Sequence, residues 1–338
     1  MRRMRARAVT AWAAAAMLLI VGCGGDSNKE ARAPQAASSA ELRAELKGAT
    51  DAKVSDFPAP AGRTLQQVAD GLDLTGPQVA LAGSVYTVGE NRFAFGVLDP
   101  KSGFVYGKTA VYVANGPGAA ARGPFPAPAD LLITDPAFRS QTAAGEDDPF
   151  AAIYEAQVPL TRAGKTSVLV VTKVDGKLAG AGTQIDVIEP ARDSIPRVGE
   201  RPPKITTDTV ASAGGDVKSI ETRLPPDDMH DVDFADVIGK KPVALLFATP
   251  ALCASRVCGP VVDIAAQLKA DYGDRVQFIH QEVYVDNEVA KGLREPLRRF
   301  NLRTEPWLFV FDRSGRVTAR LEGSFGFDAF ERALQSAL

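Results

Sequence analysis

Short apolar runs separated by turn residues occupy about residues 75–190 of the chain. Runs of this length that alternate with polar residues, or are rich in β-branched residues, are typical of strands. They lie at 79–81, 84–86, 92–98, 110–113, 153–158, 167–171 and 183–188. Asp175 and Gly176 stand between the last two runs and predict a hairpin turn. Together these short strands predict an all-β sandwich over residues 75–190.

The pattern changes to alternating strands and helices from about residue 227 to the C-terminus. In segment 260–272, Val261, Ile264 and Leu268 fall on one face of a helix. Strands are predicted at 242–248, 276–285, 307–311 and 317–322, and helices at 260–272, 288–300 and 327–338. The order β-α-β-α-β-β-α predicts an α/β domain over residues 227–338.

Three other stretches show no clear hydrophobic period. Residues 23–62 are rich in Ala, Ser, Lys, Glu and Pro and predict a flexible tether. Residues 116–148 are rich in Pro, Gly and Ala and predict a long surface loop. Residues 191–226 contain several prolines and predict an extended, semi-stiff linker between the two domains.

The N-terminus has the pattern of an export signal. Four arginines without an acid precede an apolar stretch at 11–21, which is shorter than the about 20 residues that a membrane-spanning helix needs. The run from Ile20 to Cys23 resembles the lipobox of bacterial lipoproteins. That resemblance implies a signal peptide at 1–22, acylation of Cys23 and anchoring to the cell membrane outside the cytoplasm. The alternative is an ordinary signal peptide that contains a cysteine.

Composition narrows the possible partners. The chain has 338 residues, 45% of them hydrophobic, which is enough for two domains with real cores. Its formal charge of −2 becomes more negative when the arginines of the signal peptide are removed. A nucleic-acid binder would show a basic face, so we expect no nucleic-acid partner. No second apolar run is long enough to span a membrane, which leaves the lipid as the expected anchor.

The cysteine and histidine counts limit the available chemistry. The chain has three cysteines, and acylation of Cys23 leaves Cys253 and Cys258. An isolated pair in an oxidising compartment predicts a disulfide between Cys253 and Cys258. The only histidines are His230 and His280. We therefore expect no histidine-rich metal site and no cofactor.

The last third of the chain resembles the thioredoxin fold. A strand at 243–248 runs into a cysteine-bearing loop and a helix, and Glu305 and Pro306 precede the next long strand. The resemblance implies thiol–disulfide exchange with protein thiols or disulfides as partners. It also implies that Cys253 and Cys258 are catalytic, and that Pro306 is a cis-proline facing them, which keeps the opposing backbone clear for an extended substrate.

The cysteine spacing departs from that family. Four residues separate Cys253 from Cys258, where the family has two. The Gly-Pro pair after Cys258 predicts that the helix begins near Cys258, so that Cys258 gains most from the helix N-terminus and Cys253 sits on the loop. The roles of the two cysteines are then reversed relative to the family, or the pair is structural. Glu305 would oppose a thiolate there, and Arg256 would favour it.

Three interpretations of the pair remain open. The first is redox exchange, and the second is a permanent disulfide that contributes roughly 2 kcal/mol in a redox-inactive binding or scaffold lipoprotein. The third is a copper site like that of thioredoxin-fold copper chaperones of the SCO type, formed by Cys253, Cys258 and His280. That family spaces its cysteines by three residues and takes its histidine from a later insertion, so we expect no metal at the pair.

Segment 154–171 resembles the end of an immunoglobulin-like periplasmic accessory domain. The sequence therefore predicts a multidomain protein, with an immunoglobulin-like β-sandwich followed by a thioredoxin-like α/β domain. Its predicted function is membrane-anchored, extracytoplasmic thiol–disulfide exchange. The partner of the β domain, the substrate and the kind of envelope are not predicted.

Overall fold

The predicted signal peptide at 1–22 and the acylation site Cys23 lie outside the residues that the structure describes. The structure is a computed structural model that describes residues 44, 46–99, 103–145 and 150–338. Within these ranges, no helix has both the length and the apolar character needed to cross a membrane.

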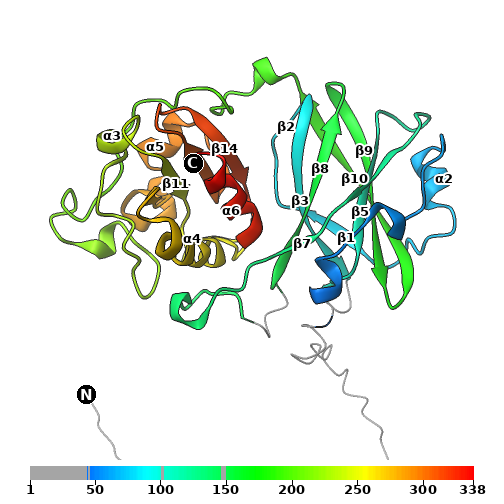
Figure 1. Cartoon of the computed structure of the whole chain (residues 1–338), viewed down its shortest axis with the longest axis horizontal. Helices are drawn as coiled ribbons and strands as arrows, with labels where there is room; N and C mark the ends of the chain where they lie inside the picture. The colour runs from blue at the N-terminus through cyan, green and yellow to red at the C-terminus, as the bar shows by residue number, and fades with distance from the viewer. Residues whose placement is uncertain (1–43, 45, 100–102, 146–149) are drawn as a thin grey trace, which may run out of the picture. The chain divides into compact units, whose positions relative to one another are not determined.

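Two antiparallel sheets follow the N-terminal segment (Figure 1). The first has the order β1-β3-β8-β7, with β4 beside β3, and its strands are β1 (Gln78–Leu81), β3 (Gly89–Asp99), β4 (Gly103–Phe104), β7 (Ala129–Leu131) and β8 (Ala152–Leu160). The second has the order β2-β10-β9-β5-β6, and its strands are β2 (Tyr86–Thr87), β5 (Thr109–Ala114), β6 (Arg122–Pro126), β9 (Gly164–Val174) and β10 (Lys177–Ile188). Only the short β2 runs parallel to its neighbour, β10.

The two sheets share one apolar core. Phe95 of β3 and Tyr154 of β8 stack with ring centroids 5.5 Å apart, and Val111 and Val170 enter the same core from β5 and β9. The predicted hairpin between β9 and β10 is confirmed, with Val174 paired to Lys177 across Asp175 and Gly176. Both turn residues have positive φ, as a two-residue turn between twisted strands requires.

The predicted loop at 116–148 contains two strands, β6 and β7. Each lies at the end of its sheet, where a proline costs no ladder hydrogen bond on its outer side. The loop prediction was wrong for these residues because proline-rich composition does not exclude an edge strand. The described part of the predicted tether also differs from a free chain, since Leu46, Ala49 and Phe57 are buried.

A four-stranded mixed sheet forms the C-terminal part, in the order β12-β11-β13-β14. Strand β11 pairs in parallel with β12 and antiparallel with β13, which pairs antiparallel with β14. The elements are α3 (Phe234–Val237), β11 (Val243–Phe247), α4 (Cys258–Tyr272), β12 (Gln277–Gln281), α5 (Glu295–Arg299), β13 (Trp307–Phe311), β14 (Val317–Glu322) and α6 (Phe327–Gln335). This order and these strand directions are what the thioredoxin-like resemblance implied.

The helix predicted at 288–300 is shorter in the structure. Two 3₁₀ turns, η5 (Val285–Asn287) and η6 (Val289–Lys291), come first, and α5 begins only at Glu295. Gly292, with φ of 79°, ends the second turn, and Pro296 stands at the start of α5, where a missing N–H is tolerated. The helical spacing of hydrophobic residues continues through 288–300 in the sequence, but Gly292 and Pro296 interrupt the helix itself.

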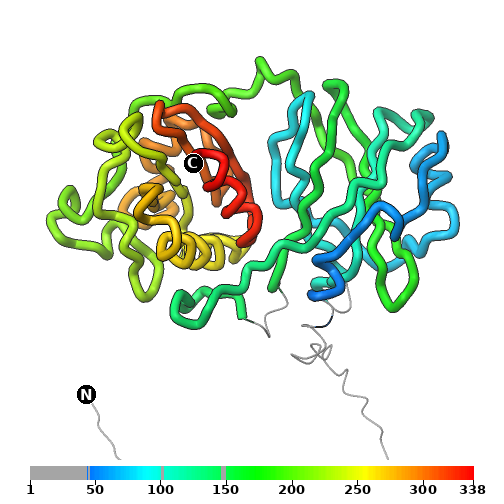
Figure 2. The backbone as a smooth tube through the Cα atoms, viewed as in Figure 1, coloured from blue at the N-terminus to red at the C-terminus, as the bar shows by residue number. Residues whose placement is uncertain are grey.

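The predicted linker at 191–226 is irregular, and Figure 2 shows it as a winding green to yellow-green tube. Ile195 and Ile205 are buried in the same core as Phe309 of β13. One 3₁₀ turn that starts before the segment ends at Arg192. A second short turn, η4 (Val217–Ser219), lies within the segment. The segment is therefore part of the C-terminal core and not only a spacer.

Asp130 of β7 caps the last helix, α6. The described residues belong to one compact unit, and in it the Asp130 carboxylate accepts hydrogen bonds from the N–H groups of Gly326, Asp328 and Ala329 at 2.9–3.0 Å. The carboxylate replaces a local cap, because Gly326 at the N-cap has no side chain. A Cβ atom on Gly326 would lie 2.4 Å from this carboxylate, so the close approach requires glycine.

Candidate active site

The cysteine loop connects β11 to α4. Strand β11 is buried along its whole length, and the chain leaves it through the buried residues Ala248 and Thr249. The N–H groups of Leu252 and Cys253 both donate to the Thr249 carbonyl, which folds the loop into a tight turn. Helix α4 then begins at Cys258, so the helix start that Gly259 and Pro260 predict is confirmed.

Both cysteines of the loop are free thiols in the structure, and they differ in exposure. Cys258 is fully buried, whereas Cys253 keeps 9% of its surface. The Cys258 thiol donates a hydrogen bond to the Cys253 sulfur, and Ser255 Oγ lies 3.2 Å from the same sulfur. The backbone N–H groups of Val257 and Cys258 also point to it. The more exposed sulfur thus collects every one of these hydrogen bonds.

These contacts give the two thiols different pKa values. The hydrogen bond from Cys258, together with those from Ser255 and the backbone, lowers the pKa of Cys253 to about 6 against the cost of burial. Burial raises the pKa of Cys258 well above its usual range, and the neighbouring Cys253 sulfur and Glu305 raise it further. Cys253 is therefore a thiolate near neutral pH, and Cys258 holds its proton.

The expectation that Cys258 gains most from the helix N-terminus is therefore wrong. Its side chain packs in the core with Val261 and Ile264, where the charged form is poorly solvated. The first N–H groups of α4 instead meet the Cys253 sulfur on the preceding loop. A thiolate benefits from a helix N-terminus when its sulfur lies in front of the N–H groups, and the first residue of the helix does not satisfy this condition here.

Glu305 interacts electrostatically with both cysteines, and Pro306 follows it in the chain. The Glu305–Pro306 peptide bond is cis, as predicted. Burial raises the pKa of Glu305, and the Cys253 sulfur raises it further, while a hydrogen bond from Tyr284 lowers it. Burial and then Glu305 also raise the pKa of Tyr284. The predicted opposition between Glu305 and a thiolate is thus present, and Tyr284 is a site neighbour that sequence reasoning missed.

A cavity of about 330 Å³ adjoins the loop. Ser255, Val257 and Glu305 line it from the C-terminal part, and residues of the first β-sheet and its loops, among them Leu81 and Phe104, line it from the other side. The β-sheet part of the chain therefore contributes a wall of the cavity beside the cysteine loop.

His280 does not join the cysteines. Its Nδ1 atom lies 2.8 Å from Asp227 Oδ2, and its Nε2 atom lies 3.2 Å from the Ala248 carbonyl oxygen. Among the residues that the structure describes, the cluster able to hold a metal ion contains His280 but neither Cys253 nor Cys258. The copper site considered from the sequence is therefore not formed, because strand β12 turns His280 toward Asp227.

No protein-family model and no curated protein matches the chain. Two solved structures are similar to it, both at 17% identity over 42% of this chain. One is described as a putative thiol:disulfide interchange protein DsbE from Chlorobium tepidum, with 98% of that chain covered and a TM-score of 0.31. The other is described as a thiol:disulfide interchange protein of the thioredoxin family from Chlorobium tepidum TLS, with 97% covered and a TM-score of 0.29. These TM-scores are too low to support a fold assignment, which rests instead on the order of the strands in the C-terminal sheet.

Proposed function

We propose that this chain is an extracytoplasmic, membrane-anchored thiol–disulfide exchange protein. The observation that carries the proposal is the asymmetry of the cysteine pair, in which the less deeply buried sulfur has a low pKa and accepts a hydrogen bond from a fully buried thiol of high pKa. In this proposal residues 227–338 are the thioredoxin-like catalytic domain, and residues 75–190 are an immunoglobulin-like module. Cys23 carries the lipid anchor, after removal of the signal peptide 1–22.

Cys253 is the nucleophile of the proposed reaction. Its thiolate attacks one sulfur of a substrate disulfide, and the other substrate sulfur leaves as a thiolate and takes up a proton. Cys258 then loses its proton and attacks the Cys253 sulfur of the mixed disulfide. This step forms the Cys253–Cys258 disulfide and releases the second substrate thiol. The substrate disulfide is reduced by two electrons, the pair is oxidised by two, and an external dithiol returns the pair to its reduced form.

Glu305 suits the role of proton acceptor for Cys258. Burial raises its pKa, and this contribution remains when Cys253 is in the mixed disulfide, so its carboxylate takes up a proton more readily than an exposed glutamate does. Once Cys253 is in the mixed disulfide, its negative charge is gone, and the Cys258 proton is lost more easily because that charge no longer opposes it. Cys258 thereby becomes a nucleophile only after the substrate is attached.

Pro306 and the cavity beside the cysteine loop mark where a substrate would lie in this proposal. Proline has no N–H group, so Pro306 offers no backbone donor to an extended peptide. The apolar wall with Leu81 and Phe104 suits a substrate side chain next to its disulfide. The β-sheet part then helps to select substrates.

A redox titration distinguishes exchange from a permanent disulfide. The reduced full-length chain is equilibrated with glutathione mixtures and trapped with an alkylating reagent, and its reduction of insulin is followed in parallel. Exchange requires a potential of about −120 to −270 mV and insulin reduction that C253S/C258S lacks. A potential below about −300 mV without insulin reduction would instead assign the pair to a structural disulfide in a redox-inactive scaffold lipoprotein.

The anchor is tested separately from the chemistry. The unsubstituted chain should partition with membranes and incorporate labelled fatty acid, and Cys23→Ala should abolish the label without changing the redox potential of the pair. Equal labelling of Cys23→Ala would refute acylation at Cys23.

A further inference from the structure

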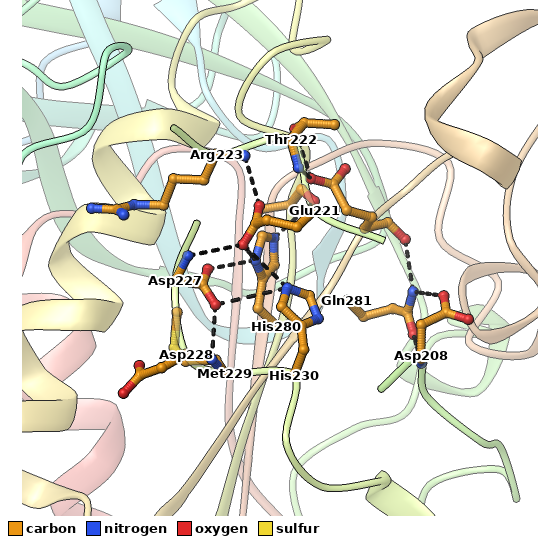
Figure 3. A network of polar contacts seen from close by, with 12 residues as sticks. Asp208, Glu221, Thr222, Arg223, Asp227, Asp228, Met229, His230, His280 and Gln281 are labelled. Carbon is orange, nitrogen blue, oxygen red and sulfur yellow. Dashed lines mark hydrogen bonds and ion pairs between the residues drawn. The ribbon is translucent and has the colours of Figure 1, made fainter. Parts of the chain in front are cut away.

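Four polar side chains form a buried group apart from the cysteines, as Figure 3 shows. They are Glu221, Asp227, His230 and His280, and each contributes one nitrogen or oxygen within 4.8 Å of the others. All four side chains are almost completely shielded from solvent, with at most 2% exposed. Glu221 comes from the packed segment at 191–226, Asp227 and His230 follow it, and His280 lies on β12.

The nitrogen and oxygen atoms of these four side chains lie close to one another. His230 Nε2 lies 3.2 Å from Glu221 Oε2 and 3.7 Å from Asp227 Oδ1. His280 Nδ1 lies 3.6 Å from Glu221 Oε2 and 2.8 Å from Asp227 Oδ2. Four ligands around a zinc ion at about 2.0–2.1 Å are separated from one another by about 3.3 Å. The observed separations lie on both sides of that value, and the two that involve Asp227 join different oxygens of its carboxylate.

Neighbouring groups hold these side chains in the orientation of metal ligands. The N–H of Arg223 donates to Glu221 Oε1 at 2.6 Å, and the N–H of Met229 donates to Asp227 Oδ1 at 2.8 Å. The Nε2 atom of His280 faces the Ala248 carbonyl, which leaves Nδ1 directed at the carboxylates. A histidine ligand typically donates its second ring N–H to such a carbonyl.

His230 supplies an independent observation. It is 1% exposed, and its Nδ1 atom is buried without a hydrogen-bond partner, while Nε2 is aimed into the group. A buried polar atom without a partner costs about 1–3 kcal/mol. The ring therefore presents Nε2 to the carboxylates of the group, while Nδ1 has no hydrogen-bond partner.

Charge also favours a cation at this place. The rings of His230 and His280 lie 2.8–3.7 Å from the carboxylates of Glu221 and Asp227, which are buried side by side. A divalent cation between the two carboxylates would neutralise both. Imidazole nitrogens with carboxylate oxygens are ligands of first-row transition metals such as zinc, whereas magnesium and calcium prefer oxygen alone.

We propose that Glu221, Asp227, His230 and His280 bind a divalent transition metal ion of the zinc type. Four protein ligands in a closed, buried setting make this a structural site, without an open position for a substrate. The ion fastens the segment before α3 to strand β12. The sequence predicted no metal, so this proposal goes beyond that expectation as well as beyond the cysteine chemistry.

The test uses cobalt and zinc on the full-length chain carrying C23S/C253S/C258S, so that no thiol can contribute. We expect equimolar binding of Co²⁺ with visible absorption typical of tetrahedral nitrogen and oxygen ligands, and no thiolate charge-transfer band. Zn²⁺ should displace Co²⁺ and raise Tm. His230→Ala and Glu221→Gln should weaken binding by about 10- to 100-fold or more. Glu155→Gln removes an equally buried carboxylate on β8 and should leave binding unchanged.

The outcomes decide the proposal even if a ligand variant folds poorly. Circular dichroism reports the fold of each variant, and the Tm of the chain with all four ligands is compared with and without Zn²⁺. Absence of equimolar binding to this chain overturns the proposal, as does unchanged affinity in a folded His230→Ala variant. Binding only when the cysteines are present also overturns it, because it would place the ion at the cysteine loop.

Discussion

The thiol of Cys258 donates a hydrogen bond to the sulfur of Cys253, and this contact gives the two cysteines different properties. The acceptor sulfur is stabilised as a thiolate, while the donor keeps its proton in the core. The same pair, joined as a disulfide, would lose both features. In the reduced form the two cysteines therefore differ in pKa, which a purely structural disulfide does not need.

The first prediction concerns pH. Because the pKa of Cys253 is lowered to about 6, its thiolate forms as pH rises through that value, and its alkylation by iodoacetamide should rise with a midpoint near pH 6. Cys258 should remain unmodified well above that pH, since burial raises its pKa. Mass spectrometry of pulse-labelled reduced protein measures both sites. A Cys253 midpoint near pH 8.5, the value of a free cysteine, would contradict the assigned hydrogen bonds.

The second prediction separates the donors to that sulfur. Cys258→Ala removes the largest stabilising contact and Ser255→Ala a smaller one, so the alkylation midpoint of Cys253 should rise in both variants, and more in Cys258→Ala. Ser336→Ala, an exposed serine on the last turn of α6, serves as the control and should leave the midpoint unchanged. An unchanged midpoint in Cys258→Ala would remove the basis for the low pKa.

The third prediction concerns Glu305. Glu305→Gln removes a negative charge beside the sulfurs, so the pKa of Cys253 should fall and its alkylation midpoint should move to lower pH. If the carboxylate accepts the Cys258 proton, the same variant should resolve a mixed disulfide more slowly, which stopped-flow fluorescence measures. Glu295→Gln on α5 is a control outside the site. Faster alkylation with unchanged resolution would keep the electrostatic effect and reject the proton-acceptor role.

The fourth prediction concerns stability. Asp130→Ala leaves the N–H groups of Gly326, Asp328 and Ala329 without their acceptor and should lower the free energy of unfolding by about 2 kcal/mol. Denaturant unfolding followed by circular dichroism gives this difference. Asp135→Ala, at the exposed cap of a 3₁₀ turn, should change stability less. Equal losses of unfolding free energy in the two variants would show that the contact of Asp130 with α6 adds no stability of its own.

Much of the fold could be predicted because it depends on local patterns. The runs of aromatic and β-branched residues along β3 and β9 mark buried strands, and Asp175 with Gly176 marks the turn after β9. Strands β6 and β7 could not be predicted, because β6 contains two prolines and β7 is only three residues long, and such sequences become strands only at a sheet edge.

The sequence predicts which residues belong to the candidate site, but it does not predict the role of each cysteine. The cysteines and Pro306 follow from order along the chain, yet which sulfur faces the N–H groups depends on how the four intervening residues fold. The group of Glu221, Asp227, His230 and His280 was missed for a similar reason. Three of its members come from a segment around the predicted linker boundary, and only tertiary packing brings them to His280 on β12.

Trapping of a mixed disulfide tests the central claim most directly. Reduced Cys258→Ser and Cys253→Ser variants of the full-length chain are each mixed with a protein substrate that contains a disulfide, and covalent complexes are resolved on a non-reducing gel. The account predicts a stable, reductant-sensitive complex with Cys258→Ser, because its nucleophile Cys253 has no resolving partner, and none with Cys253→Ser. A complex with Cys253→Ser alone, or with neither variant, would contradict the assignment of Cys253 as the attacking thiolate.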